Sequence, residues 1–253
     1  MSGHSKWSTI KHKKAALDAK KGALFTKIAR DIAVAAREGG SGDPDMNFRL
    51  RLMIDKARAA NMPADNVDRA VKKGLGIGSD GSVFEEIVYE GYSPGGAAIM
   101  VKALTDNRNR TASNIRTVFS RGGGNLGEAG SVAWMFESKS LVSVEGLTDE
   151  QSENLALSAI DAGAEDFKID SGLLEITGEP SALESIISVI KESGLELLQA
   201  HVTMIPNAIV QLENAHATQA LRLLDNIEEL EDIQQVFTNA DFSEEALEKY
   251  GNM

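Results

Sequence analysis

Gly74-Leu-Gly-Ile-Gly-Ser-Asp-Gly81 divides this sequence into two parts with different patterns. Four glycines in eight residues are typical of a linker, because glycine disfavours both helices and strands. Before this stretch, apolar residues recur at the spacing of a helix, and after it short apolar runs alternate with helical segments. The linker therefore predicts a helical N-terminal domain followed by a part that combines strands and helices.

The N-terminal part of the sequence predicts three helices. One side of the first helix, which begins near Ala15, is formed by apolar residues at helical spacing: Leu17, Leu24, Phe25, Ile28 and Ile32. Asp43-Pro44 predicts the start of the second helix, with Asp as N-cap and Pro at the first helical position. Ala64 to Lys73 predicts the third helix. We expect a three-helix basic domain over residues 15–76, preceded by a flexible basic tail over residues 1–14, which lack apolar periodicity.

The part that follows the linker predicts an α+β fold. Strands are expected at residues 83–89, 97–104, 132–137, 140–145, 166–170, 173–177, 196–204, 208–213 and 233–238, and helices at residues 108–120, 149–162, 180–192 and 215–230. Hairpins combined with crossovers in this way are typical of split βαβ, ferredoxin-like domains. We therefore predict a discontinuous α/β domain over residues 77–136 plus 206–245, with a third domain, residues 137–205, inserted in it.

Charge is distributed unevenly between the two parts. Residues 1–76 hold sixteen Lys and Arg against eight Asp and Glu, whereas residues 77–253 hold ten against thirty. A basic N-terminal part in a protein of net charge −12 predicts a polyanion-binding surface, and nucleic acid is the polyanion that we expect. The residues assigned to this surface are Lys6, Trp7, Lys11, His12, Lys13, Lys14, Lys20, Lys21, Lys27 and Arg30. The alternative is a solvated helix face, but Trp7 within the lysine run favours binding.

A second set of residues lies around a glycine-rich loop at residues 121–130. The candidate secondary anion contacts there are Arg108, Arg110, Arg116, Arg121, Gly123 and Gly124. Glycines let backbone N–H groups approach a phosphate, and the arginines precede or begin the loop. An extended flexible loop is an equally good interpretation of the same glycines.

Several classes of function are disfavoured by the sequence. It has no cysteine, and its four histidines lack metal-ligand spacing, so we expect no metal and no cofactor. Gly91-Tyr-Ser93-Pro-Gly95 matches the G-x-S-x-G pattern of hydrolases, but a strand rather than a helix is predicted after it, so we expect a hairpin turn. With no catalytic constellation, the protein is not expected to be an enzyme. The lack of cysteine and of apolar runs of bilayer length favours a cytoplasmic protein with no membrane partner.

Short motifs along the chain carry a family resemblance. They are Gly3-His-Ser-Lys-Trp7, Ile10-Lys-His-Lys-Lys14, Phe25-Thr-Lys27, Ala60-Asn-Met-Pro63, Tyr89-Glu-Gly-Tyr92, Thr105-Asp-Asn-Arg-Asn-Arg-Thr111, Gly123-Gly-Asn-Leu-Gly127 and Gly130-Ser-Val-Ala-Trp-Met-Phe136. Together they resemble the YebC family, whose mitochondrial relatives are translational activators of cytochrome oxidase. The resemblance implies a three-helix first domain and two α/β domains, the third inserted in the second. It also implies a cytoplasmic protein, either a DNA-binding probable transcriptional regulator or a ribosome-associated translation factor that relieves stalling at proline runs.

Two functions are therefore hypotheses at this point. The first is a regulator of transcription whose basic N-terminal domain contacts DNA phosphates, although no predicted helix offers an obvious face of Asn, Gln and Arg for reading bases. The second is a translation factor that binds ribosomal or transfer RNA, with Trp7 stacking on bases and Lys11, Lys13 and Lys14 contacting phosphates. An acidic body disfavours lying along bare duplex DNA, which favours the second mechanism.

Overall fold

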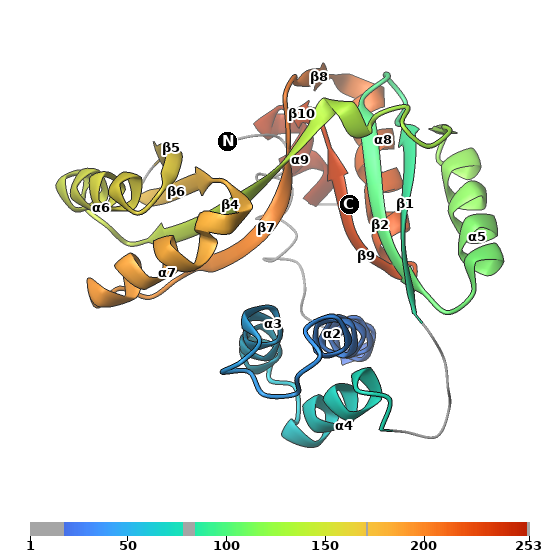
Figure 1. Ribbon diagram of the computed structural model, residues 1–253. Coiled ribbons are helices and arrows are strands. Elements are labelled where there is room, and N and C mark those ends of the chain that lie inside the picture. Colours follow the sequence, from blue (N-terminus) through green and yellow to red (C-terminus); the bar gives the residue numbers. More distant parts are fainter. Residues whose placement is uncertain (1–17, 78–83, 171, 252–253) are drawn as a thin grey trace. The chain divides into compact units, whose positions relative to one another are not determined.

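The computed structural model describes residues 18–77, 84–170 and 172–251 (Figure 1). Contacts divide the chain into two compact units: unit 1 consists of Met1–Met135 and Ala208–Met253, and unit 2 of Phe136–Asn207. Unit 2 is therefore inserted in unit 1, at limits within two residues of the predicted 137 and 205. The predicted three-helix domain and discontinuous α/β domain both fall in unit 1, and the predicted tail over residues 1–14 lies outside the described residues.

Unit 1 begins with helices α2 (Asp18–Glu38), α3 (Phe48–Ala59) and α4 (Ala64–Gly74). They enclose a small core to which α2 contributes the fully buried side chains of Ile28 and Ile32, as its apolar spacing predicts. Leu24, which was predicted on the same side, is exposed instead.

The start of α3 differs from the prediction. The helix begins at Phe48 with Asn47 as its N-cap, and Asp43-Pro44 belongs to a turn before it. The buried side chain of Asn47 accepts a hydrogen bond from the backbone N–H of Leu50 at 3.1 Å and donates to the carbonyl of Ala35 at 2.8 Å. Asn47 therefore caps α3 and ties it to α2 at once, a long-range role that a local capping rule does not contain.

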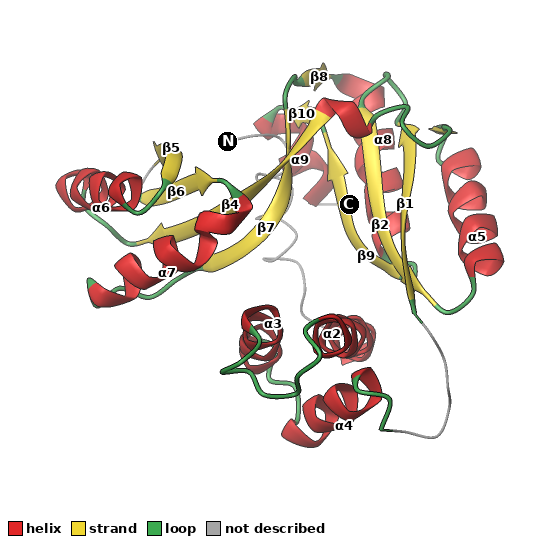
Figure 2. Ribbon diagram, in the orientation of Figure 1, coloured by secondary structure: helices red, strands yellow, loops and turns green. Residues whose placement is uncertain are grey.

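The α/β part of unit 1 contains a four-stranded antiparallel sheet in the order β3-β1-β2-β9. Its strands are β1 (Glu85–Tyr92), β2 (Ala98–Thr105), β3 (Asn125–Leu126) and β9 (Ile233–Thr238). Two short strands, β8 (Val210–Leu212) and β10 (Ala240–Phe242), form a separate parallel pair. The helices are α5 (Arg108–Arg121), α8 (Asn214–Glu228) and α9 (Glu244–Gly251) (Figure 2). The strands β3 and β10 and the helix α9 were not among the predicted elements.

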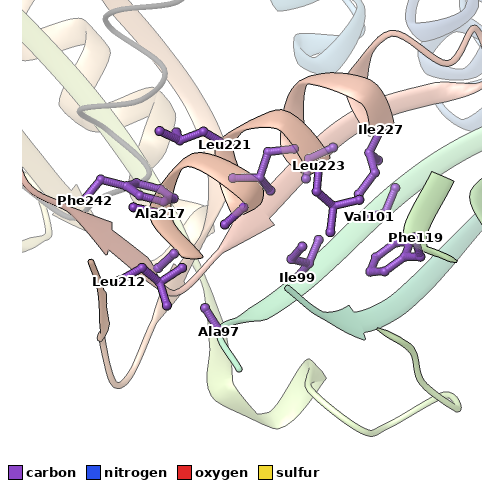
Figure 3. Close-up of a cluster of buried hydrophobic side chains, with 14 of the residues drawn as sticks. Ala97, Ile99, Val101, Phe119, Leu212, Ala217, Leu221, Leu223, Ile227 and Phe242 are labelled. Carbon is purple, nitrogen blue, oxygen red and sulfur yellow. The ribbon is translucent and has the colours of Figure 1, made fainter. Parts of the chain in front are cut away.

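The core of this part lies between the sheet and helices α5 and α8. Figure 3 shows Leu223 and Ile227 of α8 beside Ile99 and Val101 of β2 and Phe119 of α5. All five side chains are almost completely buried, and the burial of their apolar area helps to hold the two helices on the sheet.

Unit 2 is a split βαβ, ferredoxin-like fold, as predicted. Its elements are β4 (Phe136–Glu145), α6 (Asp149–Asp161), β5 (Ala164–Asp170), β6 (Leu173–Gly178), the 3₁₀ turn η2 (Pro180–Ala182), α7 (Leu183–Glu192) and β7 (Gln199–Pro206). The antiparallel sheet has the order β5-β6-β4-β7. Its first and last residues, Phe136 and Pro206, are paired across β4 and β7, so the chain enters and leaves unit 2 at neighbouring positions.

Two strands were predicted at residues 132–137 and 140–145, but the structure has one continuous strand here. The predicted start at residue 132 is wrong. Residues Ala133–Met135 form the 3₁₀ turn η1, and β4 begins at Phe136. The reason is the carboxylate of Glu90, which accepts the backbone N–H groups of Gly130, Val132 and Ala133, each at 2.7 Å. Backbone N–H groups that converge on one carboxylate hold the chain in a turn. They are then not available for the hydrogen bonds of a β-sheet.

Candidate nucleic-acid interface

Most of the predicted binding residues lie in or near the N-terminal tail. Lys6, Trp7, Lys11, His12, Lys13 and Lys14 fall outside the described residues. Lys20 and Lys21 belong to the first turn of α2. The described part of the predicted surface is thus reduced to Lys27 and Arg30 on the same helix.

Lys27 and Arg30 are held by the protein rather than directed to solvent. Lys27 donates to the carbonyl of Glu228, at the end of α8. Arg30 donates to the carbonyl of Glu231 at 2.8 Å, to its carboxylate at 2.9 Å and to the carboxylate of Asp232 at 3.1 Å. Its side chain is only 12% exposed. The prediction that these two cations form a free binding face is therefore wrong, because acceptors some two hundred residues along the chain already hold them.

Other cations of the three helices are also paired. Arg49 forms ion pairs with Glu38 and Glu86, Lys56 with Asp31, and Arg58 with Asp55. In the described part of this domain, Arg37 and Lys72 are exposed and form no ion pair. Both lie in the last turn of a helix, where a cation also complements the helix dipole.

Asp232 is the centre of the largest charge cluster around α5. It is 4% exposed and accepts hydrogen bonds from Thr111 Oγ1 at 2.7 Å and from Arg110 Nη2 at 2.9 Å, besides its bond to Arg30. Burial by itself raises the pKa of Asp232, but these hydrogen bonds and the charges of Arg110 and Arg30 outweigh it, so the pKa is lowered. Arg110, which also pairs with Asp106, is consequently a structural ion-pair partner here rather than a free anion contact.

The glycine N–H groups of the glycine-rich loop are used inside the protein. The N–H groups of Gly122, Gly123, Gly124 and Gly127 donate to backbone carbonyls, and that of Gly130 donates to Glu90. The anion-contact interpretation is therefore wrong for Gly123 and Gly124, whose donors are used inside the protein.

The glycines are explained by close packing instead. A Cβ atom on Gly124 would lie 2.7 Å from both the carbonyl oxygen of Tyr92 and the side chain of Leu223. Gly123 has φ +73°, a conformation that side-chain-bearing residues rarely adopt.

The remaining arginines of this set lie on the surface of α5. Arg108, Arg116 and Arg121 are exposed, and no carboxylate of the described residues forms an ion pair with them. Arg116 and Arg121 share the outer side of the helix with exposed Asn, Ser and Thr side chains, whereas Arg108 is the first residue of the helix. These exposed side chains are Asn109, Ser113, Asn114, Thr117 and Ser120. The surface of α5 thus combines Asn with Arg but contains no Gln. The signal in the sequence is that residues 107–127 contain no Asp or Glu.

The G-x-S-x-G stretch is a hairpin turn, as predicted. The N–H of Ser93 donates to the carbonyl of Ala97 at 2.8 Å, and the N–H of Gly96 donates to the carbonyl of Ser93 at 3.0 Å. The hydroxyl of Ser93 is directed to the carbonyl of Pro94.

Within the described ranges, no group of three or more potential metal ligands comes together. None of the helices there combines the length and the apolar character that a bilayer crossing needs.

Comparison with known proteins places these elements in a family. The family model described as "TACO1/YebC protein N-terminal domain" matches residues 5–77, and that described as "TACO1/YebC second and third domain" matches residues 84–240. The gap between the two matches falls at the glycine-rich linker. A "Probable transcriptional regulatory protein" from Roseiflexus castenholzii is 48% identical over 252 residues, which cover 99% of each chain.

Two further proteins agree with this assignment. A relative with the same name from Trichlorobacter lovleyi is 49% identical over 98% of this chain and 99% of its own. The crystal structure of a conserved hypothetical protein from Aquifex aeolicus is 42% identical and superposes with a TM-score of 0.81, covering 91% of this chain and 94% of that one. By sequence and by fold, the chain belongs to the TACO1/YebC family.

Proposed function

We propose that this protein is a nucleic-acid-binding regulator of gene expression that acts in the cytoplasm by binding and not by catalysis. The observation that carries the proposal is the charge asymmetry: sixteen Lys and Arg against eight Asp and Glu in residues 1–76, and ten against thirty in residues 77–253. The positive potential of the N-terminal part attracts a polyanion, and the negative potential of the remainder repels it. The relatives are named probable transcriptional regulatory proteins, which supports the regulatory role.

The contact that we propose is concentrated in the N-terminal tail. Because Lys27, Arg30, Arg49, Lys56 and Arg58 are engaged within the protein, the described helices supply few cations for a ligand. Lys11, Lys13 and Lys14 are then the principal phosphate contacts, with Trp7 available to stack on a base. DNA is the first target to test, since phosphate contacts of this kind position a protein on a duplex.

Ribosomal or transfer RNA is the second candidate target, in which case the protein is a translation factor that acts on the ribosome. The observation that favours it is the acidity of residues 77–253, which repels a long duplex over most of the surface. A folded RNA can receive a short cationic tail in a pocket without running along the acidic body.

A salt titration of duplex DNA binding tests the first candidate. We expect the Lys11→Ala/Lys13→Ala/Lys14→Ala variant of the full chain to lower the slope of log K against log salt by about 3, because each lost phosphate contact removes about 1. The matched control is Lys168→Ala/Lys191→Ala/Lys249→Ala, which removes three exposed lysines from the acidic part. Equal slopes for the two triple variants would rule out the tail as the contact.

Sedimentation of cell lysate on a sucrose gradient tests the second candidate. If the protein acts on the ribosome, the wild type moves into the ribosomal fractions and the tail variant stays at the top, while the control variant behaves as the wild type. A wild type that stays wholly at the top excludes the ribosomal role. A wild type that neither enters these fractions nor binds duplex DNA or RNA overturns the proposed function as a whole.

A further inference from the structure

Helix α5 presents a second surface of unusual composition, here named the α5 face. It consists of the exposed side chains of Asn109, Ser113, Arg116, Thr117, Ser120 and Arg121. The opposite side of the helix is fixed in the unit 1 core, where Thr111, Ile115 and Phe119 are at most 1% exposed. The α5 face is therefore held on a rigid element, and Figure 1 shows α5 at an edge of its unit.

Charge separates the α5 face from the rest of the α/β part. Residues 77–253 hold thirty Asp and Glu, but none lies between residues 107 and 127. Four of the ten Lys and Arg of residues 77–253 lie in α5. Asp232 and Asp106 neutralise Arg110, so Arg116 and Arg121, together with Arg108 at the helix start, provide the local positive charge. Such a cluster of positive charge on an otherwise acidic protein is complementary to a polyanion.

The polar side chains between the arginines point to a particular polyanion. Ser113 and Ser120 carry hydroxyl groups and Asn109 carries an amide, so each can both donate and accept a hydrogen bond. The hydroxyl of Thr117 donates to the carbonyl of Ser113 at 2.9 Å, so it offers a ligand its acceptor lone pairs. A phosphate only accepts, whereas the ribose 2′-hydroxyl does both and distinguishes RNA from DNA. These side chains are also short, which suits the wide, shallow minor groove of an RNA duplex better than the deep major groove of B-DNA.

From this composition we propose that the α5 face binds the sugar–phosphate backbone of double-helical RNA. Arg116 and Arg121 of this face, together with Arg108 at the start of the helix, contact phosphates, and the hydroxyl-bearing side chains contact 2′-hydroxyl groups. Arg108 and Arg121 are separated by the length of the fourteen-residue helix, about 20 Å, so they reach different phosphates. The inference rests on the nucleic-acid binding proposed above, and it adds a second contact on the part of the protein whose net charge opposes binding.

Fluorescence anisotropy of the full chain with a short RNA duplex and a DNA duplex of the same sequence tests the inference. The charge variant is Arg108→Gln/Arg116→Gln/Arg121→Gln, and its control is Lys168→Gln/Lys191→Gln/Lys249→Gln. Both variants remove three positive charges from residues 77–253, so a difference between them reports position and not net charge. We expect the charge variant to bind the RNA at least about tenfold more weakly at low salt and the control to bind as the wild type.

A third variant tests the choice of RNA over DNA. Ser113→Ala/Thr117→Val/Ser120→Ala keeps every charge and removes the three hydroxyls. We expect its RNA affinity to fall about tenfold while its DNA affinity stays that of the wild type, because DNA lacks the 2′-hydroxyl partner. Circular dichroism and thermal unfolding of all variants establish that α5 is intact.

The outcomes separate this inference from the proposed function. If the charge variant binds RNA as its control does, while Lys11→Ala/Lys13→Ala/Lys14→Ala still weakens binding, the α5 inference fails and the proposed function stands. If the hydroxyl variant loses RNA and DNA affinity equally, or neither, the assignment to RNA fails. A wild type that binds neither duplex overturns the α5 inference, and it overturns the proposed function as well if the protein also stays out of the ribosomal fractions.

Discussion

The carboxylate of Glu90 accepts the backbone N–H of Val132 at 2.7 Å, forty-two residues further along the chain. The same carboxylate binds the N–H groups of Gly130 and Ala133, and the side chain of Glu90 is 5% exposed. Burial alone raises the pKa of Glu90, but the three backbone donors outweigh it and lower the pKa below its ordinary value. One buried charge thus fixes the segment that leads from the glycine-rich loop into β4.

Glu90→Gln is expected to destabilise the protein by about 2–3 kcal/mol. Glutamine has the same shape, but its single oxygen cannot serve donors that now bond to both carboxylate oxygens, and its NH₂ group faces an N–H donor. Urea unfolding measures the loss. Glu85→Gln, an exposed position in the same strand, is the control and should change the free energy of unfolding little. Equal stabilities of the two variants would contradict the role of Glu90.

Asp232 is expected to make part of the stability dependent on pH. The pKa of Asp232 is lowered in the folded protein. The stability that its carboxylate contributes is therefore fully present above the pKa of the unfolded chain, about 4. This stability is lost as the pH falls from there through the lower pKa of the folded protein. Asp232→Asn should therefore cost about 2 kcal/mol at neutral pH, and the difference from the wild type should shrink in acid.

Urea unfolding at several pH values between neutrality and acid measures the pH dependence at Asp232. Asp68→Asn, which replaces an exposed aspartate on α4, is the control variant measured at the same pH values. A constant difference between the wild type and Asp232→Asn at every pH would argue against the ion-pair cluster.

Two glycine-to-alanine substitutions are expected to act in opposite directions. In Gly124→Ala the new methyl group meets the backbone carbonyl of Tyr92 at 2.7 Å, and the backbone cannot easily move, so we expect a loss of about 1–3 kcal/mol. In Gly22→Ala, within α2, nothing lies within 4 Å, and alanine favours the helix by about 0.5–1 kcal/mol. Thermal or urea unfolding of both variants gives the signs, and a stabilised Gly124→Ala would contradict the packing of the loop.

Removal of unit 2 is expected to leave a folded unit 1. Because Phe136 and Pro206 are paired across β4 and β7, a short Gly-Ser linker can join Met135 to Ala208. The shortened protein should unfold in one cooperative transition, as measured by circular dichroism. A matched variant with the same linker inserted between Asn207 and Ala208, at the junction of the two units, but with unit 2 retained controls for the linker itself. A shortened protein without a cooperative transition would show that unit 1 needs its insert.

The elements of the fold that depend on neighbours in sequence were predictable. The three helices of the N-terminal domain, α5 and the turn at Ser93 follow from spacing, glycine and proline, which act over a few residues. The capping of α3 and the start of β4 were not predictable in this way. Asn47 and Glu90 decide them through partners elsewhere in the chain, and the local rules favoured Asp43-Pro44 and an early strand instead.

The sequence by itself determined the domain types, the glycine-rich linker and the separation of a basic N-terminal part from an acidic remainder. Only the tertiary structure decided which cations are available to a ligand. Arg30 and Arg110 are held by Asp232, which lies 202 and 122 residues away, whereas Arg116 and Arg121 have no such partner among the described residues. The physical reason is that the free energy of a charge depends on its burial and on the charges that the fold brings near it, and sequence spacing contains neither.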